Sequence, residues 1–148
     1  MYNIQLKIDG YHIVIVGGGK IAYRKYLSLN NEDITINVVS PTFIEAFEQV
    51  QDNRLTLIRR TYKEGDIEGA NIVFISTNNP KVNDQIRQHA TCHQLINHTG
   101  DKDQSDFYNV KTFQYQSCEI SISSSGKDVK QTKAVSNKLW AMLKEESK

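Results

Sequence analysis

Three consecutive glycines, Gly17-Gly18-Gly19, constrain the fold of this chain more than any other feature. They follow directly on residues 11–16, a β-branched run that reads Tyr-His-Ile-Val-Ile-Val and predicts a buried strand. Residues 20–30 predict a helix, because Ile21, Ala22 and Leu27 recur there at helical spacing. A strand, a tight turn and a helix in direct succession are typical of the first unit of a βαβ fold.

Strands and helices continue to alternate up to about residue 100. Apolar or β-branched runs predict further strands at 34–39, 55–59, 70–76 and 94–97. Helical stretches are expected around Phe43, Phe47 and Val50 and over 81–92. Because such alternation requires right-handed crossovers, we predict an α/β fold with a Rossmann-like, doubly wound parallel sheet.

The pattern changes after Gly100. A polar loop, 101–106, leads to two expected strands, 110–115 and 119–123, and then to a helix over 128–144. We therefore expect a Rossmann-like domain over 1–109 and a short α/β segment over 110–148. This segment either completes the sheet or forms a dimerisation lobe that buries Trp140, Met142 and Leu143 against a partner.

Composition excludes several classes of protein. Eighteen Lys and Arg against seventeen Asp and Glu give a net charge of +1, so no overall field attracts nucleic acid or an anionic membrane. Purely apolar runs such as Ile13–Val16 are far shorter than the roughly 20 residues of a membrane span. The two cysteines lack zinc-site spacing. We expect a cytoplasmic protein with no metal, nucleic-acid or membrane partner.

The glycines also belong to a recognisable ligand motif. Residues 17–22 fit the dinucleotide pattern G-x-G-x-x-G/A, so we expect Gly17, Gly18, Gly19, Lys20, Ile21 and Ala22 to bind the cofactor. In this pattern Gly17 allows the turn, Gly19 lets backbone N–H groups approach a pyrophosphate, and Ala22 keeps helix and strand close. The second strand ends without an acid or an arginine, at Val39-Ser40-Pro41, which leaves NAD and NADP as alternatives.

Three histidines are further candidates for proton transfer or metal binding. His98 is expected at the carboxyl end of the fifth strand, where it either relays a proton or is an exposed loop residue. His89 and His93 are four residues apart on an expected helix, but with no third ligand a solvated helix face is the favoured interpretation.

Residues 16–25 read V-G-G-G-K-I-A-Y-R-K and resemble the opening signature of the siroheme synthase and precorrin-2 dehydrogenase family, V-G-G-G-x-V-A-x-R-K. Other segments of the resemblance occur in the same order, and together they cover nearly the whole chain. These are residues 6–10, 39–41, Tyr62 with 66–70, 76–79 with Asn83, and 122–126.

The resemblance implies an NAD-dependent enzyme that oxidises precorrin-2 to sirohydrochlorin in siroheme biosynthesis, with NAD favoured over NADP. It implies a homodimer formed through the segment after the dinucleotide-binding domain, and some family members also insert ferrous iron. It assigns Ser40 and Pro41 to the adenosine side of the cofactor, and Thr77 and Asn78 to the nicotinamide side.

The chain departs from the family where a catalytic aspartate usually follows the fifth strand. Gly100 occupies that position and Asp101 comes one residue later, so Asp101 is the expected acid or base, with His98 beside it. The family's further helical segment does not follow within these 148 residues, which favours hydride transfer over iron insertion. The alternatives are a bifunctional enzyme that also inserts iron and a non-catalytic NAD-binding module.

Precorrin-2 is a polycarboxylate, so its site requires cations or N–H groups. Lys102 and Lys127 are expected to contribute because they adjoin loops at the presumed ligand edge. Ser124 and Ser125 precede a helix, where they either bind a substrate carboxylate or simply cap the helix.

Overall fold

The computed structural model describes residues 2–29 and 33–146, which form two compact units. One unit is Ile4–Phe107, and the other extends from Tyr108 onward and includes Tyr2 and Asn3. The larger unit contains the dinucleotide motif.

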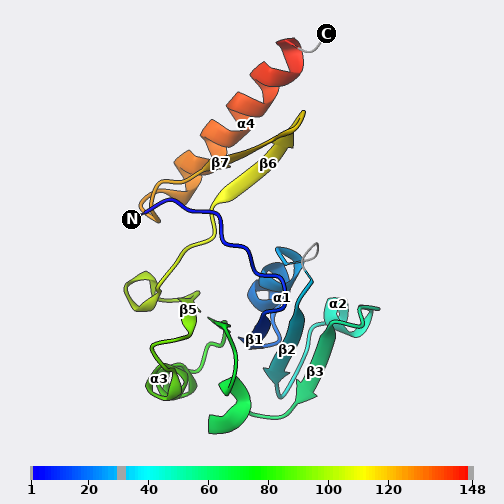
Figure 1. The fold of residues 1–148 in the computed structure, drawn as a ribbon, viewed down its shortest axis with the longest axis vertical. Coiled ribbons are helices and arrows are strands. Elements are labelled where there is room, and N and C mark those ends of the chain that lie inside the picture. Colours follow the sequence, from blue (N-terminus) through cyan, green and yellow to red (C-terminus); the bar gives the residue numbers. More distant parts are fainter. Residues whose placement is uncertain (1, 30–32, 147–148) are drawn as a thin grey trace. The chain divides into compact units, whose positions relative to one another are not determined.

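The larger unit is built on a five-stranded parallel sheet with the strand order β3-β2-β1-β4-β5 (Figure 1). Its strands are β1 (His12–Val16), β2 (Thr35–Ser40), β3 (Leu55–Arg59), β4 (Ile72–Ile75) and β5 (Leu95–His98). The central strand, β1, pairs with β2 on one side and with β4 on the other. The order and the parallel pairing confirm the predicted Rossmann-like fold.

Both faces of the sheet are buried, and the side chains of each strand point alternately to one face and the other. Ile13 and Ile15 of β1 face the first cluster, where α1 (Lys20–Leu27) and α2 (Glu45–Glu48) pack. Val14 and Val16 face the second cluster, which α3 (Pro80–His89) and the 3₁₀ turn η1 (Glu64–Ile67) cover. This is a doubly wound arrangement.

Helix α1 is shorter than its sequence predicts. It ends at Leu27, and Asn30, the predicted end, lies outside the described residues. Its buried face consists of Ala22 and Tyr26, whereas Ile21 and Leu27 are exposed. The apolar spacing therefore predicts the helix correctly but assigns only part of its buried face.

Two other helices also differ from expectation. Helix α2 is a single turn because Ile44, just before it, has an extended backbone with ψ of 153°. Helix α3 ends at His89, since Ala90 is extended with ψ of 139°. His93 is therefore not on the helix, and the expected spacing of two histidines on one helical face does not form.

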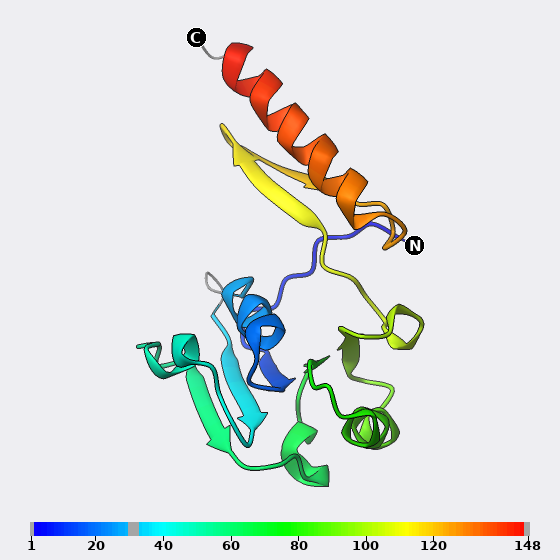
Figure 2. The same ribbon diagram turned by 180° about the vertical axis from the view of Figure 1, so that it is seen from behind.

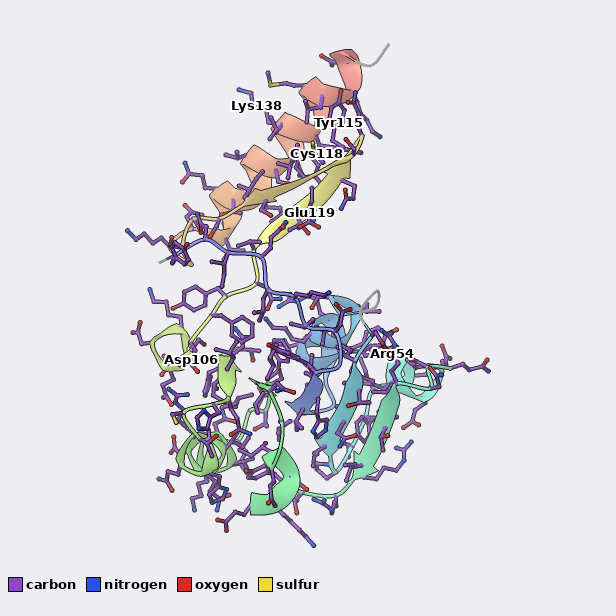
Figure 3. The ribbon with its side chains drawn as sticks, in the orientation of Figure 1. Arg54, Asp106, Tyr115, Cys118, Glu119 and Lys138 are labelled. Carbon is purple, nitrogen blue, oxygen red and sulfur yellow. The ribbon has the colours of Figure 1, made fainter. Side chains whose placement is uncertain are left out.

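The polar loop after β5 is closely bound to that edge strand. The backbone N–H of Asp106 donates to the Ile96 carbonyl at 2.8 Å, and the Ile96 N–H donates back to the Asp106 carboxylate at 2.8 Å. Ser105 accepts the His98 N–H through its hydroxyl at 2.9 Å. Figure 3 labels Asp106 in this loop, which covers the open edge of the sheet.

The smaller unit has a separate two-stranded antiparallel sheet, formed by β6 (Lys111–Tyr115) and β7 (Cys118–Ile122). It is followed by the long helix α4 (Val129–Glu146), which packs along the hairpin (Figure 2). The rings of Phe113 and Trp140 meet edge to face with centroids 5.3 Å apart. Of the two expectations for this segment, completion of the parallel sheet is wrong.

Candidate dinucleotide-binding site

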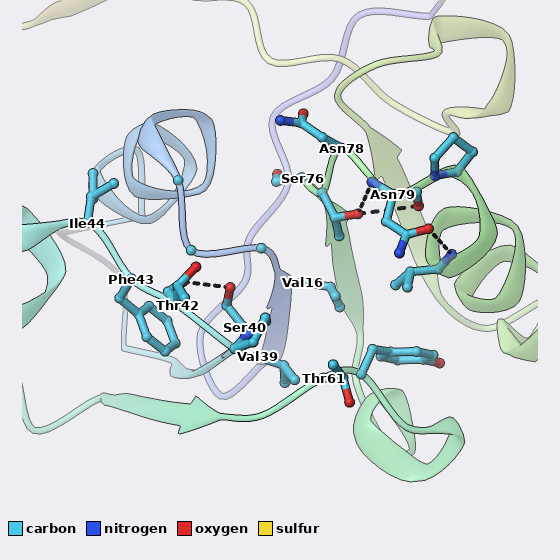
Figure 4. Close-up of a pocket in the computed structure, with 18 residues that line it drawn as sticks. Val16, Val39, Ser40, Thr42, Phe43, Ile44, Thr61, Ser76, Asn78 and Asn79 are labelled. Atoms are coloured by element: carbon cyan, nitrogen blue, oxygen red, sulfur yellow. Dashed lines mark hydrogen bonds between the residues drawn. The ribbon is translucent and has the colours of Figure 1, made fainter.

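A cleft of about 740 Å³ opens at the carboxyl ends of the parallel strands (Figure 4). It lies where β1 has its neighbours β2 and β4, the point at which the strand order reverses. Ligands of open α/β sheets bind at this switch point. The lining residues come from 16–19, 39–44, 61–62, 76–80 and Val82.

Two of the three glycines are required by the packing around the turn. Gly17 has a φ of +126°, and a Cβ there would lie 2.4 Å from the Ser76 carbonyl oxygen. A Cβ on Gly18 would lie 2.1 Å from the Thr42 carbonyl oxygen. Both contacts are with backbone atoms, so any side chain at these positions would force the strands and loops apart.

Gly19 differs from the other two glycines. A Cβ at this position would meet no atom within 4 Å, and its φ is −91°, which any residue adopts. Gly19 lines the cleft and is the N-cap of α1, with no side chain capping that end. The first N–H groups of the helix thus remain available beside open space, an arrangement that suits a pyrophosphate.

Backbone hydrogen bonds hold the glycine turn against β2 and the loop that follows it. Gly17 donates its N–H to the Val39 carbonyl at 2.9 Å, and Ile44 donates to the Gly18 carbonyl at 3.0 Å. The Ser40 hydroxyl donates to the Thr42 carbonyl at 2.7 Å, as Figure 4 shows. This wall of the cleft is therefore preorganised.

The opposite wall is the loop between β4 and α3. Thr77 and Asn78 line it, and Asn79 caps α3 by accepting the Lys81 N–H at 3.1 Å. The hydroxyl oxygen of Ser76 is buried and has no hydrogen-bond partner among the described residues. A polar ligand in this cleft would find unmet hydrogen-bonding capacity there.

Residues 4–111 match the family described as putative NAD(P)-binding. The chain belongs to this family. It is 29% identical to the precorrin-2 dehydrogenase of Bacillus subtilis over 97% of this chain and 89% of that protein. It is 33% identical to the precorrin-2 dehydrogenase of Priestia megaterium over 66% of this chain and 48% of the relative. A solved structure titled SirC, precorrin-2 dehydrogenase, superposes with a TM-score of 0.86 at 25% identity, covering 95% of this chain and 70% of that one.

Most of the cofactor-binding residues expected for this NAD(P)-binding chain gather at the cleft. Those that line it are Gly17, Gly18, Gly19, Ser40, Pro41, Thr77 and Asn78. Ala22 is fully buried below the turn, where a larger side chain would separate α1 from the sheet. Lys20 and Ile21 are exposed and do not line the cleft, so a role for their side chains stays a prediction.

Tyr62 and His89 form a pair that the sequence pattern misses. The Tyr62 ring lines the cleft, and its hydroxyl lies 3.1 Å from Nδ1 of His89, with the two rings stacked. Burial, together with nearby Asp66 and Glu64, raises the pKa of Tyr62 to about 12, so its phenol stays protonated at neutral pH. Among the described residues, no group of three or more His, Cys, Asp or Glu side chains could hold a metal.

Asp101, in the loop after β5, and His98, the last residue of β5, lie outside the lining of the cleft. Asp101 is the N-cap of the 3₁₀ turn η2 (Lys102–Gln104), and its carboxylate accepts the Asp103 N–H and the Gln104 side-chain amide, each at 2.9 Å. These hydrogen bonds, the Gln104 one foremost, lower the pKa of Asp101. The catalytic role of Asp101 stays a prediction.

The His98 ring has a defined orientation. Its Nδ1 accepts the N–H groups of Gly100 and Asp101 at 3.2 and 2.9 Å. In the neutral ring the proton is therefore on Nε2, which can donate. A Cβ added to Gly100 would lie 3.5 Å from the His98 ring, an ordinary contact, so the backbone accepts a side chain at this position.

The four residues expected to bind the substrate are divided between the two units. Lys102 begins η2, while Ser124, Ser125 and Lys127 precede α4. The Ser124 hydroxyl accepts the Asp128 N–H at 3.0 Å, and Asp128 is the residue that caps α4, since its carboxylate accepts the Gln131 N–H at 2.8 Å. A role of any of the four toward carboxylates stays a prediction.

No helix among the described residues is both long and apolar enough to span a bilayer.

Proposed function

We propose that this chain is an NAD-dependent dehydrogenase that oxidises precorrin-2 to sirohydrochlorin. The observation that carries the proposal is the alignment of 97% of the chain with a precorrin-2 dehydrogenase, combined with a cleft whose glycine turn leaves space for a pyrophosphate. When bound, NAD accepts a hydride from the substrate. The chain supplies binding, orientation and proton handling.

In this proposal the N-terminus of α1 holds the pyrophosphate through its free N–H groups and its positive dipole end. Ser40 and Pro41 form the adenosine side, and Thr77 and Asn78 form the nicotinamide side. Tyr62, whose hydroxyl stays protonated, lines the same cleft without adding a charge. The cofactor ring is thereby held at the carboxyl edge of the sheet.

We further infer that Asp101 and His98 handle the proton that leaves precorrin-2 with each hydride. Asp101 supplies the lone pair that accepts this proton, while the neutral His98 ring, with Nδ1 held by the loop, presents an N–H at Nε2 that can donate a hydrogen bond beside it. Lys102, Lys127, Ser124 and Ser125 would bind substrate carboxylates. The protein would act in the cytoplasm as a homodimer.

Turnover with single variants tests the assignment. Purified protein is incubated with precorrin-2 and NAD without oxygen, and sirohydrochlorin and NADH are followed by their spectra. Asp101→Asn keeps an acceptor for the Asp103 N–H but removes the ionisable group, so we expect turnover to fall about 100-fold or more with little change in stability. Asp101→Ala, which also removes the cap, should lose turnover and stability together.

Gly100 favours a second candidate, a non-catalytic NAD-binding module, because it replaces the aspartate of the family pattern. This candidate predicts NAD binding without any turnover of precorrin-2. Adding ferrous iron and sirohydrochlorin without NAD, in a parallel reaction, tests for iron insertion.

A further inference from the structure

The end of β3 carries an arginine beside the adenosine side of the cleft. Arg59 is the register partner of Ser40, the last residue of β2, on the neighbouring parallel strand. Neighbouring strands lie about 4.8 Å apart, and the side chains of register partners point to the same face. The long side chain of Arg59 can therefore reach a group bound beside Ser40.

Phe43 lies between this arginine and the glycine turn. Its ring lines the cleft (Figure 4), and a Cβ added to Gly18 would lie 3.0 Å from the Cδ1 atom of this ring. The guanidinium carbon of Arg59 is 5.2 Å from the centroid of the same ring. Arg59 thus borders the wall of the cleft without forming part of it.

Glu48 of α2 takes up the guanidinium of Arg59. Arg59 Nη1 donates to Oε1 of Glu48 at 2.7 Å, and Nη2 donates to Oε2 in a second, shorter hydrogen bond. The same parallel pair of N–H groups is what an arginine presents to a phosphate. While Glu48 is ionised, the donors that a 2′-phosphate would use are occupied.

The next arginine is held in the same way. Arg60 donates to both carboxylate oxygens of Asp66, at 2.7 and 2.5 Å. The side chain of Asp66 is only 6% exposed, whereas that of Glu48 is 42% exposed. Of the two pairs, the one with Glu48 lies at the surface and can be altered without disturbing the core.

We propose that Glu48 determines the cofactor preference of this site by holding Arg59, so that the cleft takes NAD and not NADP. The proposal deepens the proposed function and rests on its assignment of Ser40 to the adenosine side. The proposal also explains how the site can distinguish NAD from NADP although β2 ends without the usual acid. The carboxylate that withholds Arg59 from a 2′-phosphate comes from α2 and not from β2.

Nucleotide binding to the whole chain, measured by calorimetry without tetrapyrrole, tests the proposal. Glu48→Gln removes the charge, and Glu45→Gln is the matched control, because Glu45 lies on the same short helix and contacts Gln49 instead of Arg59. For Glu48→Gln we expect the affinity for NADP to rise about tenfold or more, with NAD affinity unchanged within about twofold. Adding Arg59→Met to Glu48→Gln should abolish the gain in NADP affinity. Glu45→Gln alone should produce no gain.

Each alternative result has a defined meaning. An unchanged NADP affinity in Glu48→Gln would overturn the proposal, as would a gain that survives Arg59→Met or that Glu45→Gln reproduces. Binding of neither nucleotide by the unaltered chain would overturn both this proposal and the proposed function. NAD binding with the expected Glu48 effect but no oxidation of precorrin-2 would overturn the proposed function alone.

Discussion

Asn83 holds Thr77 at two points. The Thr77 hydroxyl donates to Oδ1 of Asn83 at 2.9 Å, and Nδ2 of Asn83 donates to the Thr77 carbonyl at 3.2 Å. Asn83 is buried on α3, while Thr77 lines the cleft. A side-chain amide in the helix therefore fixes the backbone of this wall of the cleft, since the amide bonds both a donor and an acceptor of Thr77.

We expect Asn83→Ala to weaken both folding and cofactor binding. The substitution leaves the Thr77 carbonyl and hydroxyl without their partner, which should lower the free energy of unfolding by about 1–3 kcal/mol. NAD affinity should fall because Thr77 and Asn78 lose their fixed position. Denaturant unfolding and calorimetry measure the two effects. Asp84 is exposed and follows Asn83 in the chain, so in the control Asp84→Ala the free energy of unfolding and the NAD affinity should change little.

Alanine at Gly18 and at Gly19 should act in opposite ways. At Gly18 the new methyl group would overlap the Thr42 carbonyl, so the folded protein should lose several kcal/mol of stability. At Gly19 the methyl group meets no protein atom, so the unfolding midpoint should stay close to that of the unaltered chain while NAD affinity falls at least tenfold. If Gly19→Ala binds NAD normally, the pyrophosphate does not lie against this turn.

The network of Asp52, Arg54 and Tyr26 should make the fold sensitive to acid. Arg54 donates to Asp52 through its guanidinium and its backbone, and Tyr26 donates its hydroxyl at 2.8 Å. Figure 3 labels Arg54 in this network. These contacts, the Arg54 side chain foremost, hold the pKa of Asp52 well below its usual range.

Because the folded-state pKa is depressed, the stabilisation is present above the usual Asp pKa of about 3.9 and is lost as the pH falls through the folded-state value. The free energy of unfolding of Asp52→Asn should therefore depend less on pH below about 4 than that of the unaltered chain. Urea unfolding at a series of pH values measures this. A slope that Asp52→Asn leaves unchanged would assign the acid sensitivity to other carboxyl groups.

The parallel sheet and the glycine turn can be predicted from sequence because their signals are local. The run before Gly17 is β-branched, and the glycines mark the turn that follows. The extent of α2 could not be predicted in this way. Phe43 and Phe47 match helical spacing, but Phe43 packs against the first core cluster from an extended segment before the helix starts.

The contacts that shape the site depend on long-range packing and leave little trace in the sequence. Glu48 and Arg59 are 11 residues apart, and Tyr62 and His89 are 27 apart, on separate elements that only the fold brings together. His89 illustrates the difficulty, because its spacing to His93 suggests a shared helical face. Its actual partner is a tyrosine from the loop after β3.

The exposed apolar residues of α4 provide a test of the proposed homodimer. Val135 and Met142 are seven residues apart, so they lie on one stripe of the helix, and they are 47% and 52% exposed. If a second copy covers this stripe, Met142→Lys should place a charge in the interface and shift the protein toward monomer. We expect the dimer dissociation constant to rise at least tenfold, as measured by sedimentation.

Asn137→Lys is the matched control for this dimer test. It adds the same charge at an exposed position on another side of α4, so it should leave the dimer intact. Trp140 is the only tryptophan of the chain and contacts Phe113, so its fluorescence reports whether the small unit of each variant stays folded. Equal sedimentation of both variants, with Trp140 fluorescence unchanged, would mean that this stripe of α4 is not the dimer interface.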